Sequence, residues 1–423
     1  MSLRFAPPRH APRGVLLARD TTRYPSLLGL AMHAPERRQA PRNFPSRALA
    51  AACGALLSVT ACTNAANEPS PDTRTAVAAS ASPLPPSSPS PSSPNPSSPS
   101  PSTVQSRGDP RAREIASDLE APWGVVPLKD GSFLISERDT RRIIRVDNGS
   151  RSRLRTIDEA DPAGEGGLLG LAITADQKTV FAYYTAAGDN RIVTMSWNGR
   201  DLGAPKVILR DIPKGFIHNG GRMVIGPDNY LYVGTGESGD GSLSQDKDSL
   251  GGKILRLRLD GRPAPGNPFD NEVFSYGHRN VQGLAFDDQN RLWASEFGQQ
   301  DWDELNLIRE GANYGWPEVE GSGGVEGMTN PKVVWRTREA SPSGLAYWQG
   351  DLWMAGLRGE RLWKIPLDGT NTGDPIAHFR GDYGRLRTVV VAQDRNSLLL
   401  SNSNTDGRGD PSGDDDRLFQ VTR

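Results

Sequence analysis

The sequence predicts an all-β fold for residues 111–423, a six-bladed β-propeller of four-stranded antiparallel blades. Two observations lead to this prediction. Apolar runs in this region are short and alternating, and they end at Asp-Gly, Asp-Asn or Asn-Gly turns, as is typical of many short antiparallel strands. The region also repeats one pattern six times: a small residue, an apolar strand, a turn, a second strand, a variable loop and a third strand. A propeller blade has this form, whereas the repeats of a β-sandwich array would be longer.

The six repeats follow one another along the chain. They open with APWGVVPLKDG, GGLLGLAITAD, GGRMVIGPDN, VQGLAFDDQN, PSGLAYWQGD and RLRTVVVAQD. We expect the first strand of each repeat to lie next to a central channel and a more variable fourth strand to lie outermost. Residues 111–118 (RAREIASD) precede the first repeat, and we expect them to pair with the last blade and close the ring.

Two further segments precede the propeller. Residues 1–62 have the features of an export signal peptide, because an arginine-rich stretch precedes the short apolar run ALAAACGALLSVTA. The end of this run, VTAC, resembles the lipobox of bacterial lipoproteins. Cys62 would then carry a lipid anchor on the outer face of the cytoplasmic membrane; an ordinary cleaved signal is the alternative. Residues 1–31 are not needed for such a signal, which makes Met32 a candidate start. Residues 63–110 are rich in Pro and Ser, which predicts a disordered linker.

Charge and cysteine content restrict the function classes. The net charge of −1 combines +7 for residues 1–61, which contain nine Arg and two acids, with −8 for the remainder, so nucleic acid is not expected as a partner. No apolar span of 18 residues predicts a lasting membrane helix. Both cysteines, Cys53 and Cys62, precede the linker, so the propeller is expected to have no disulfide.

Polar residues from separate repeats are expected to converge at one mouth of the channel, because they come just before first strands or just after second strands. Those before first strands are Glu165, His218, Arg279, Asn280, Ser341, Arg385 and Arg387. Those after second strands are Arg138, Glu237, Gly298, Gln299, Arg358 and Asn402.

The expected cluster is rich in arginine and poor in carboxylates. Arg279, Arg358, Arg385 and Arg387 would place four positive charges around one cavity, which is unfavourable without an anion. Guanidinium groups suit carboxylates, so we expect a poly-anionic ligand. Nearby positive charge would keep a histidine neutral and able to act as a general base. A structural histidine is the alternative for His218.

Several motifs resemble a known family. YGHRNVQGLAFDDQNRLWASEFGQQDWDELNLIREGANYGWP (276–317), GEGGLLGLA (164–172), HNGGRMVIGPD (218–228) and RLR (385–387) are similar, in the same order, to the soluble sugar dehydrogenases that use pyrroloquinoline quinone (PQQ). The resemblance extends from about residue 115 to 420, and the short loops favour the aldose sugar dehydrogenase branch. It implies a six-bladed propeller that binds PQQ, a tricarboxylate quinone, with Ca²⁺ over the channel mouth. It also implies oxidation of aldose sugars to lactones, with electrons passed to an external acceptor such as a respiratory quinone or redox protein.

The resemblance also implies residue roles. His218 would take the proton of the anomeric hydroxyl while a hydride moves to the quinone, and Arg279 would polarise the quinone carbonyl. The residues expected to hold the cofactor are Glu165, Asn280, Arg358, Arg385 and Arg387, where the family often has glutamine in place of Glu165 and lysine in place of Arg358. The carbonyls of Gly298 and Gln299 would bind Ca²⁺. Glu304 and the carbonyl of Tyr314 match a second, structural calcium site. Ile217 stands where glucose dehydrogenase has an acid, which argues against narrow glucose specificity.

Two other functions compete with this one. A calcium-dependent hydrolase such as a sugar lactonase would need several channel carboxylates as metal ligands, and the expected cluster is poor in acids. A non-catalytic carbohydrate- or protein-binding propeller would not need His218 and Arg279 together. The acidic segment 406–416 (DGRGDPSGDDD) is expected to be a solvated loop; calcium binding and adhesion are the alternatives.

Overall fold

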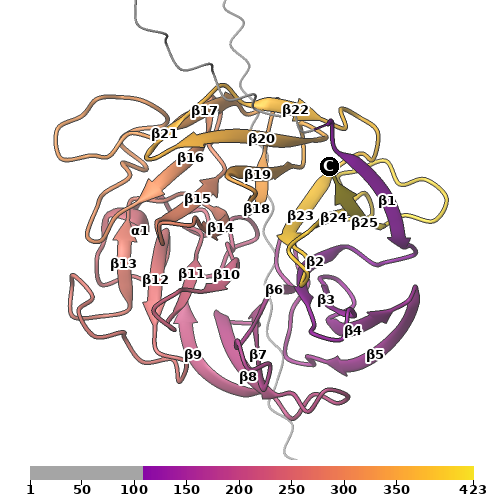
Figure 1. Cartoon of the computed structure of the whole chain (residues 1–423). Helices are drawn as coiled ribbons and strands as arrows, with labels where there is room; N and C mark the ends of the chain where they lie inside the picture. The colour runs from indigo at the N-terminus through magenta and orange to yellow at the C-terminus, as the bar shows by residue number, and fades with distance from the viewer. Residues whose placement is uncertain (1–107) are drawn as a thin grey trace, which may run out of the picture. The chain divides into compact units, whose positions relative to one another are not determined.

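The predicted propeller is present in the computed structural model, which describes residues 108–423. Six antiparallel sheets surround a central channel (Figure 1). Five sheets take their strands in chain order from the channel outward, and the sixth runs β23, β24, β25 and then β1. The innermost strands are β2, β6, β10, β14, β18 and β23. The signal peptide, the lipobox with Cys62 and most of the linker lie outside the described residues.

The strands of the six blades have the following bounds. Blade 1 contains β2 (Pro122–Pro127), β3 (Phe133–Glu137), β4 (Arg142–Asp147) and β5 (Ser150–Thr156); blade 2 contains β6 (Leu168–Ile173), β7 (Thr179–Thr185), β8 (Asn190–Ser196) and β9 (Lys206–Ile212). Blade 3 contains β10 (Met223–Ile225), β11 (Leu231–Gly234), β12 (Lys253–Leu257) and β13 (Val273–Tyr276); blade 4 contains β14 (Val281–Phe286), β15 (Leu292–Glu296), β16 (Trp302–Ile308) and β17 (Val333–Arg336). Blade 5 contains β18 (Pro342–Trp348), β19 (Asp351–Gly356) and β20 (Arg361–Asp368), with both β21 (Asn371–Thr372) and β22 (Ile376–His378) paired to β20; blade 6 contains β23 (Leu386–Val391), β24 (Leu398–Asn402), β25 (Leu418–Thr422) and β1 (Arg111–Ala116).

The ring closes through the first strand of the propeller. As expected, β1 pairs antiparallel with β25 as the outermost strand of blade 6, with Arg113 opposite Gln420. Nη2 of Arg113 also donates a hydrogen bond to Oε1 of Gln420 at 2.8 Å. Because the two ends of the propeller share one sheet, ring closure depends on contacts between residues about 300 positions apart in sequence.

Glycines inside the innermost strands have a packing role. Five of the six innermost strands have a register shift against the second strand of their blade. Gly170 and Gly344 lie at two of these irregularities. A Cβ at Gly344 would lie 2.7 Å from the backbone nitrogen of Val389 in the next blade, and one at Gly170 would collide with the carbonyl oxygen of Gly221. Glycine therefore allows neighbouring inner strands to approach closely around the channel.

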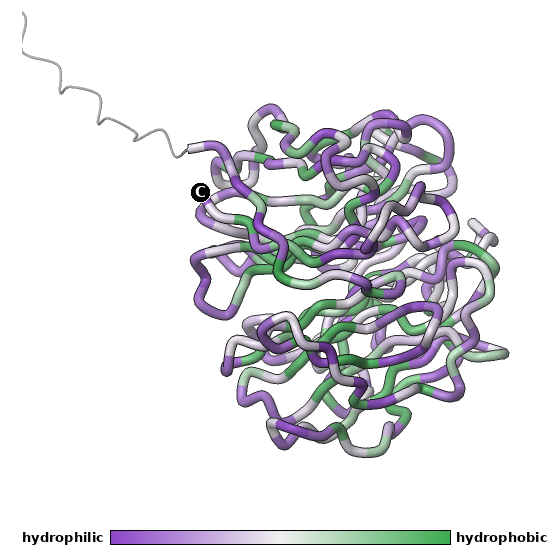
Figure 2. The backbone as a smooth tube through the Cα atoms, turned by 90° about the vertical axis from the view of Figure 1, so that its right-hand side faces the viewer, coloured by the Kyte–Doolittle hydropathy of each residue, from purple (hydrophilic) through white to green (hydrophobic). Residues whose placement is uncertain are grey.

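The hydrophobic core is divided among the blades. Six clusters of buried side chains each fill the space between two neighbouring blades. In one of them, Leu134 of blade 1 packs in the same cluster as Leu168 of blade 2. Hydrophobic segments follow the strands inside the body, and hydrophilic segments lie mainly in the outer loops (Figure 2). Each fully buried Leu or Ile contributes about 1.5–3 kcal/mol to folding, so the blades are held face to face mainly by apolar packing.

One element departs from the all-β prediction. A short helix, α1 (Ser242–Gln245), follows the second strand of blade 3. Nζ of the buried Lys253, the first residue of β12, donates to the carbonyl oxygens of Leu243 and Gly251, each at 2.6 Å. The bond to Leu243 links α1 to β12. Burial lowers the pKa of Lys253 to about 7. Among residues 108–423, no helix is long and apolar enough to cross a membrane.

Candidate active site

Loops from several blades converge at one mouth of the channel. Glu165 comes from blade 2, His218 and Glu237 border blade 3, Arg279 precedes blade 4, and Arg385 precedes blade 6. Hydrogen bonds link these loops across blade boundaries: His218 N–H donates to Glu165 Oε2 at 2.9 Å, and Glu237 N–H donates to the carbonyl of Arg279 at 2.9 Å. The structure therefore brings together residues that are up to 220 positions apart in sequence.

His218 adopts an unusual backbone conformation. Its φ of 56° lies in the left-handed region, and the side chain is buried. Gly220 (φ 60°) and Gly221 (φ 105°) follow in the same region of backbone space. A Cβ at Gly220 would lie 2.6 Å from the backbone of Thr235, so only glycine fits there. The two glycines after the histidine thus permit the tight turn that directs its ring into the cluster.

A carboxylate orients the histidine ring. Nδ1 of His218 is in close hydrogen-bond contact with Oε1 of the buried Glu237. A carboxylate accepts the proton of Nδ1–H, which in neutral imidazole leaves the lone pair on Nε2. The sequence placed Glu237 on this face without assigning it a role. The geometry gives it the role of the group that fixes the tautomer of His218.

The carboxylate of Glu165 holds His218 by accepting a hydrogen bond from its backbone N–H. Its second oxygen, Oε1, accepts a hydrogen bond from Nη1 of Arg408 at 2.6 Å. Burial raises the pKa of Glu165, but the hydrogen bond from the His218 N–H and the charge of Arg408 outweigh burial and hold this pKa below its usual range. Glu165 is therefore an ionised group that positions residue 218.

A carboxylate that we expected to be solvated lies between two of the arginines. Nη2 of Arg385 and Nη2 of Arg387 contact Oδ2 of Asp406 at 2.9 and 3.0 Å. Asp406 is buried, and burial raises its pKa, but the charge of Arg387 and the hydrogen bond and charge of Arg385 hold it below the usual range. The prediction of unneutralised guanidinium groups was therefore wrong for this pair, which shares one negative charge.

The prediction of a solvated loop at residues 406–416 was wrong at both of its ends. Asp416 is fully buried, and its Oδ2 accepts a hydrogen bond from Ala121 N–H at 3.2 Å. Arg408, in the same loop, reaches Glu165. The signal that could have identified Asp406 is its place in the loop after the second strand of blade 6, since Glu237 also lies in the loop after a second strand.

Arg279 and Asn280 border blade 4 at the mouth. Nη1 of Arg279 donates to the carbonyl of Gly298 at 2.6 Å, and the guanidinium lies over the Trp316 ring at 5.2 Å from its centroid. Oδ1 of Asn280 accepts a hydrogen bond from Gly220 N–H at 3.0 Å. Burial lowers the pKa of Arg279, against the opposing charges of Glu237 and Glu320.

Three buried N–H groups of the expected catalytic and cofactor-binding residues have no hydrogen-bond partner among residues 108–423. They are Nε of Arg279, Nδ2 of Asn280 and Nε of Arg387. Buried polar groups are normally paired, and these three groups are all donors. Burial also lowers the pKa of Arg387 to about 10, in spite of Asp406. A ligand with several anionic oxygens fits this set of donors.

The expected metal ligands lie in two different environments, one around Gly298 and Gln299 and the other around Glu304. The carbonyl of Gly298 already accepts a cationic donor, Arg279, whereas the neighbouring Gln299 is exposed. The oxygens of Glu304 accept from Gly321 N–H at 2.7 Å and Asn306 Nδ2 at 3.0 Å, and burial together with the charge of Glu296 raises the pKa of Glu304 to about 8.

Tyr314 is buried, and its ring stacks on the ring of His278 with 4.6 Å between the ring centroids. A small cavity is lined by Glu304, Tyr314 and Gly298 among others. Within the described chain, no group of three or more His, Cys, Asp or Glu side chains is arranged to hold a metal ion. A calcium ion at these positions would therefore depend largely on main-chain carbonyl oxygens, which suit Ca²⁺.

Arg358 stands apart from the other arginines. It is exposed in the turn after β19, and in the part of the chain that the structure describes no hydrogen bond or ion pair joins it to the network. A buried arginine that the sequence did not single out lies in the channel instead. Arg222 donates from Nε to the carbonyl of Gln282 at 2.7 Å and lies 4.2 Å over the Trp123 ring, and burial lowers its pKa to about 9.

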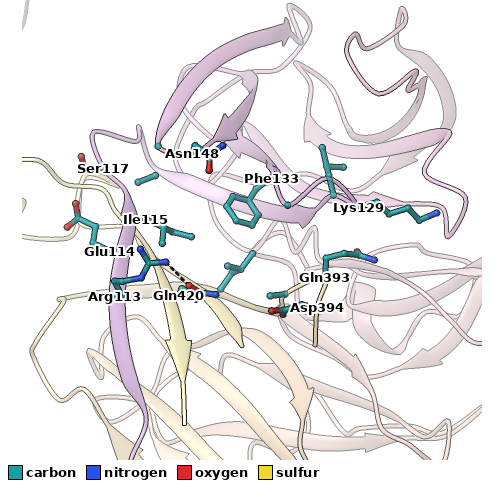
Figure 3. Close-up of a pocket in the computed structure, with 16 residues that line it drawn as sticks. Arg113, Glu114, Ile115, Ser117, Lys129, Phe133, Asn148, Gln393, Asp394 and Gln420 are labelled. Carbon is teal, nitrogen blue, oxygen red and sulfur yellow. Dashed lines mark hydrogen bonds between the residues drawn. The ribbon is translucent and has the colours of Figure 1, made fainter. Parts of the chain in front are cut away.

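A large cavity of the propeller lies away from this cluster. It measures about 910 Å³ and is a groove at the outer rim, between β1 and the turns of blade 1, with Arg113, Phe133 and Gln420 in its wall (Figure 3). It contains none of the expected site residues. The chemistry of the channel mouth, rather than the size of a cavity, therefore identifies the candidate site.

Comparisons with known proteins identify relatives of this chain. The sequence model of a family described as glucose/sorbosone dehydrogenase matches residues 119–409. A solved structure of the PQQ-bound form of an aldose sugar dehydrogenase from Streptomyces coelicolor is 56% identical, with a TM-score of 0.72, and the match covers 74% of this chain and 98% of that one. An aldose sugar dehydrogenase of Escherichia coli is 29% identical over 69% of this chain and 90% of its own length. Quinoprotein glucose dehydrogenase B of Acinetobacter calcoaceticus is 33% identical over 49% of this chain and 52% of its own length.

Proposed function

The chain belongs to the glucose/sorbosone dehydrogenase family, and we propose that it is a PQQ- and calcium-dependent aldose sugar dehydrogenase that oxidises the anomeric carbon to a lactone. The Streptomyces coelicolor relative is an aldose sugar dehydrogenase solved with PQQ bound, and it is similar over the whole propeller. The observation that carries the proposal is the set of unpaired, buried donors on Arg279, Asn280 and Arg387 beside the His218–Glu237 pair.

The residues at the mouth fit a tricarboxylate quinone. Arg279, Asn280 and Arg387 offer N–H groups that have no partner among the described residues, and two guanidinium groups share the single charge of Asp406. This side of the site therefore keeps surplus positive charge for carboxylates. The carbonyls of Gly298 and Gln299 are hard oxygen donors for Ca²⁺. When bound, PQQ supplies the acceptor for the hydride that leaves the anomeric carbon, and Ca²⁺ polarises its carbonyl.

The chain's own residues perform the proton chemistry. Nε2 of His218 accepts the proton of the anomeric hydroxyl, because Glu237 holds the other ring nitrogen as the donor. Glu237 then stabilises the imidazolium that forms. Arg279 provides a positive charge where negative charge develops on the acceptor oxygen. The sugar loses one proton to His218 and two electrons with the second hydrogen, which leaves a lactone.

The finer features of the proposal follow the sequence. Electrons pass onward to an external acceptor, a respiratory quinone or a redox protein. The enzyme acts outside the cytoplasm and is held at the membrane by lipid on Cys62. Glu304 and the carbonyl of Tyr314 take part in a second, structural calcium site. Glu304 and Tyr314 line one small cavity, which supports this assignment.

The calcium-dependent hydrolase fits the mouth less well. Such an enzyme needs carboxylates free to bind metal directly. The channel carboxylates Glu165, Glu237 and Asp406 instead contact Arg408, His218 and the arginine pair. They position other side chains rather than gather as ligands.

A reconstitution experiment tests the proposed function. The purified protein is mixed with PQQ and Ca²⁺, and dye reduction is followed with a panel of aldoses. We expect turnover with several aldoses, and none when Ca²⁺ is chelated before PQQ is added. If PQQ does not bind and no aldose supports dye reduction, the proposal is overturned.

A further inference from the structure

One carboxylate oxygen organises the loop that follows β15. Oε1 of Glu320 accepts hydrogen bonds from four consecutive backbone N–H groups, those of Gln299 at 2.7 Å and of Gln300, Asp301 and Trp302 at 3.0 Å each. The preceding N–H, that of Gly298, donates to Oδ1 of Asp303 at 3.0 Å. Five successive peptide N–H groups are therefore directed at carboxylates.

Gly298 is required for this arrangement. A Cβ at this position would collide with the carbonyl of Trp302 and lie 2.6 Å from Oε1 of Glu320. The loop therefore closes on itself around the carboxylate, and no side chain fits at residue 298. The sequence alone explained Gly298 only as a turn residue or a source of a carbonyl ligand.

The hydrogen bonds to Glu320 determine where two carbonyl groups point. The C=O of Gly298 shares a peptide unit with the N–H of Gln299, and the C=O of Gln299 shares one with the N–H of Gln300. In a planar trans peptide the C=O and N–H groups point in opposite directions. Because both N–H groups point at Glu320, both carbonyl oxygens point away from it.

The outward side of the loop already receives positive charge. The carbonyl of Gly298 accepts a hydrogen bond from Nη1 of Arg279 at 2.6 Å, and the same nitrogen lies 3.4 Å from the carbonyl of Phe297. These carbonyl oxygens are therefore directed toward a site that suits a cation. The negative charge of Glu320 behind the loop increases this preference.

We propose that Glu320 is a positioning residue for the calcium ion. It holds the N–H sides of two peptide units, and the carbonyl oxygens of the same units, those of Gly298 and Gln299, then face the cation. This inference rests on the proposed function, which places Ca²⁺ at these carbonyls. Glu320 does not touch the ion; it acts through the orientation of the loop and through its charge. Groups that orient metal ligands in this way typically contribute 10–100-fold to metal affinity.

Calcium affinity measured by calorimetry tests the role of Glu320. With PQQ present throughout, Ca²⁺ is titrated into the calcium-free protein and into its variants. We expect Glu320→Ala to raise the Kd for Ca²⁺ about 10–100-fold, and Glu320→Gln, which keeps an acceptor oxygen but no charge, to have a smaller effect. Glu318→Ala is the matched control, because Glu318 is an exposed glutamate two residues away. Its Kd should equal that of the natural protein.

A purely structural role would give a different result. Excess Ca²⁺ should restore PQQ binding to Glu320→Ala, as followed by cofactor absorbance, whereas loss of the fold would not respond to Ca²⁺. An unchanged Kd in Glu320→Ala overturns the inference, and if that variant does not fold, an unchanged Kd in Glu320→Gln does so. If the natural protein itself binds no Ca²⁺, the calcium-dependent function fails instead, so the two failures are distinguishable.

Discussion

On one side of the channel mouth, two carboxylates hold one histidine; on the other side, one carboxylate holds two arginines. Glu237 contacts the ring of His218 and Glu165 accepts from its backbone N–H at 2.9 Å. Asp406 contacts Arg385 and Arg387 at 2.9 and 3.0 Å. Carboxylates thus outnumber the basic side chain on the first side, and basic side chains outnumber the carboxylate on the second. The first side presents a proton acceptor with a defined tautomer, and the second keeps a surplus of positive charge for an anionic guest.

Replacement of the base should have the largest effect on activity. His218→Ala removes the proton acceptor, so we expect kcat to fall about 10²–10⁴-fold, the usual contribution of a general base. PQQ affinity should stay near that of the natural protein, because the donors on the arginine side remain. Steady-state dye reduction and cofactor titration measure the two quantities. Loss of PQQ binding would show that His218 is a cofactor ligand instead.

Removal of the shared carboxylate should affect stability most. Asp406→Asn leaves Arg385 and Arg387 buried together without a counter-charge, and breaking such a buried pair typically destabilises a protein by about 3–5 kcal/mol. Chemical denaturation measures the free energy of unfolding. Asp410→Asn, an exposed position in the same loop, is the control and should change little. Equal stability of both variants would contradict the contrast between the two sides.

Neutralisation of the orienting carboxylate should have an intermediate effect on turnover. Glu237→Gln keeps the shape of the side chain but weakens its preference for the Nδ1–H tautomer of His218. We expect kcat to fall about 10–100-fold, with KM and PQQ affinity nearly unchanged. A variant with full kcat would show that the ring does not depend on Glu237.

Low pH should lower the free energy of unfolding through a carboxyl group on each side of the mouth. The pKa values of Glu165 and Asp406 are both held below their usual range. A carboxyl with a depressed folded pKa stabilises the fold above its unfolded pKa, near 4, and this contribution is lost as pH falls through the folded value. Unfolding measured between pH 3 and 6 should therefore show stability falling toward acid. Asp406→Asn should have a shallower fall than the natural protein.

The repeats predicted the fold because residues within each repeat determine the geometry of its blade. Each repeat carries its own turn residues and its own small residue, such as Gly170, and the unpaired segment 111–118 matched the strand missing from blade 6. The short helix α1 left no such signal, because it depends on the buried Lys253 and its contacts with main-chain carbonyls.

The candidate site was predicted in its histidine, most of its arginines, Glu165 and Glu237, but not in Asp406. Position relative to the first strands placed His218, Arg279 and Arg387 at the mouth. Asp406 was missed because its neighbours in sequence are polar and look solvated, while its partners lie about 20 residues earlier. Arg358 was expected from its position after a second strand and from the family resemblance, yet its turn leaves it exposed. Nothing in local composition shows which carboxylate folds back onto which loop, as Glu320 does.

Single-turnover reduction of bound PQQ tests the central claim most directly. The protein is loaded with PQQ and Ca²⁺, an aldose is added without any external acceptor, and cofactor absorbance is followed. We predict that one equivalent of sugar reduces the bound quinone in the natural protein, while His218→Ala binds the quinone but reduces it about 10²–10⁴-fold more slowly. Equal reduction rates in the two proteins, or no bound quinone in either, would contradict a base that faces a cofactor across this channel mouth.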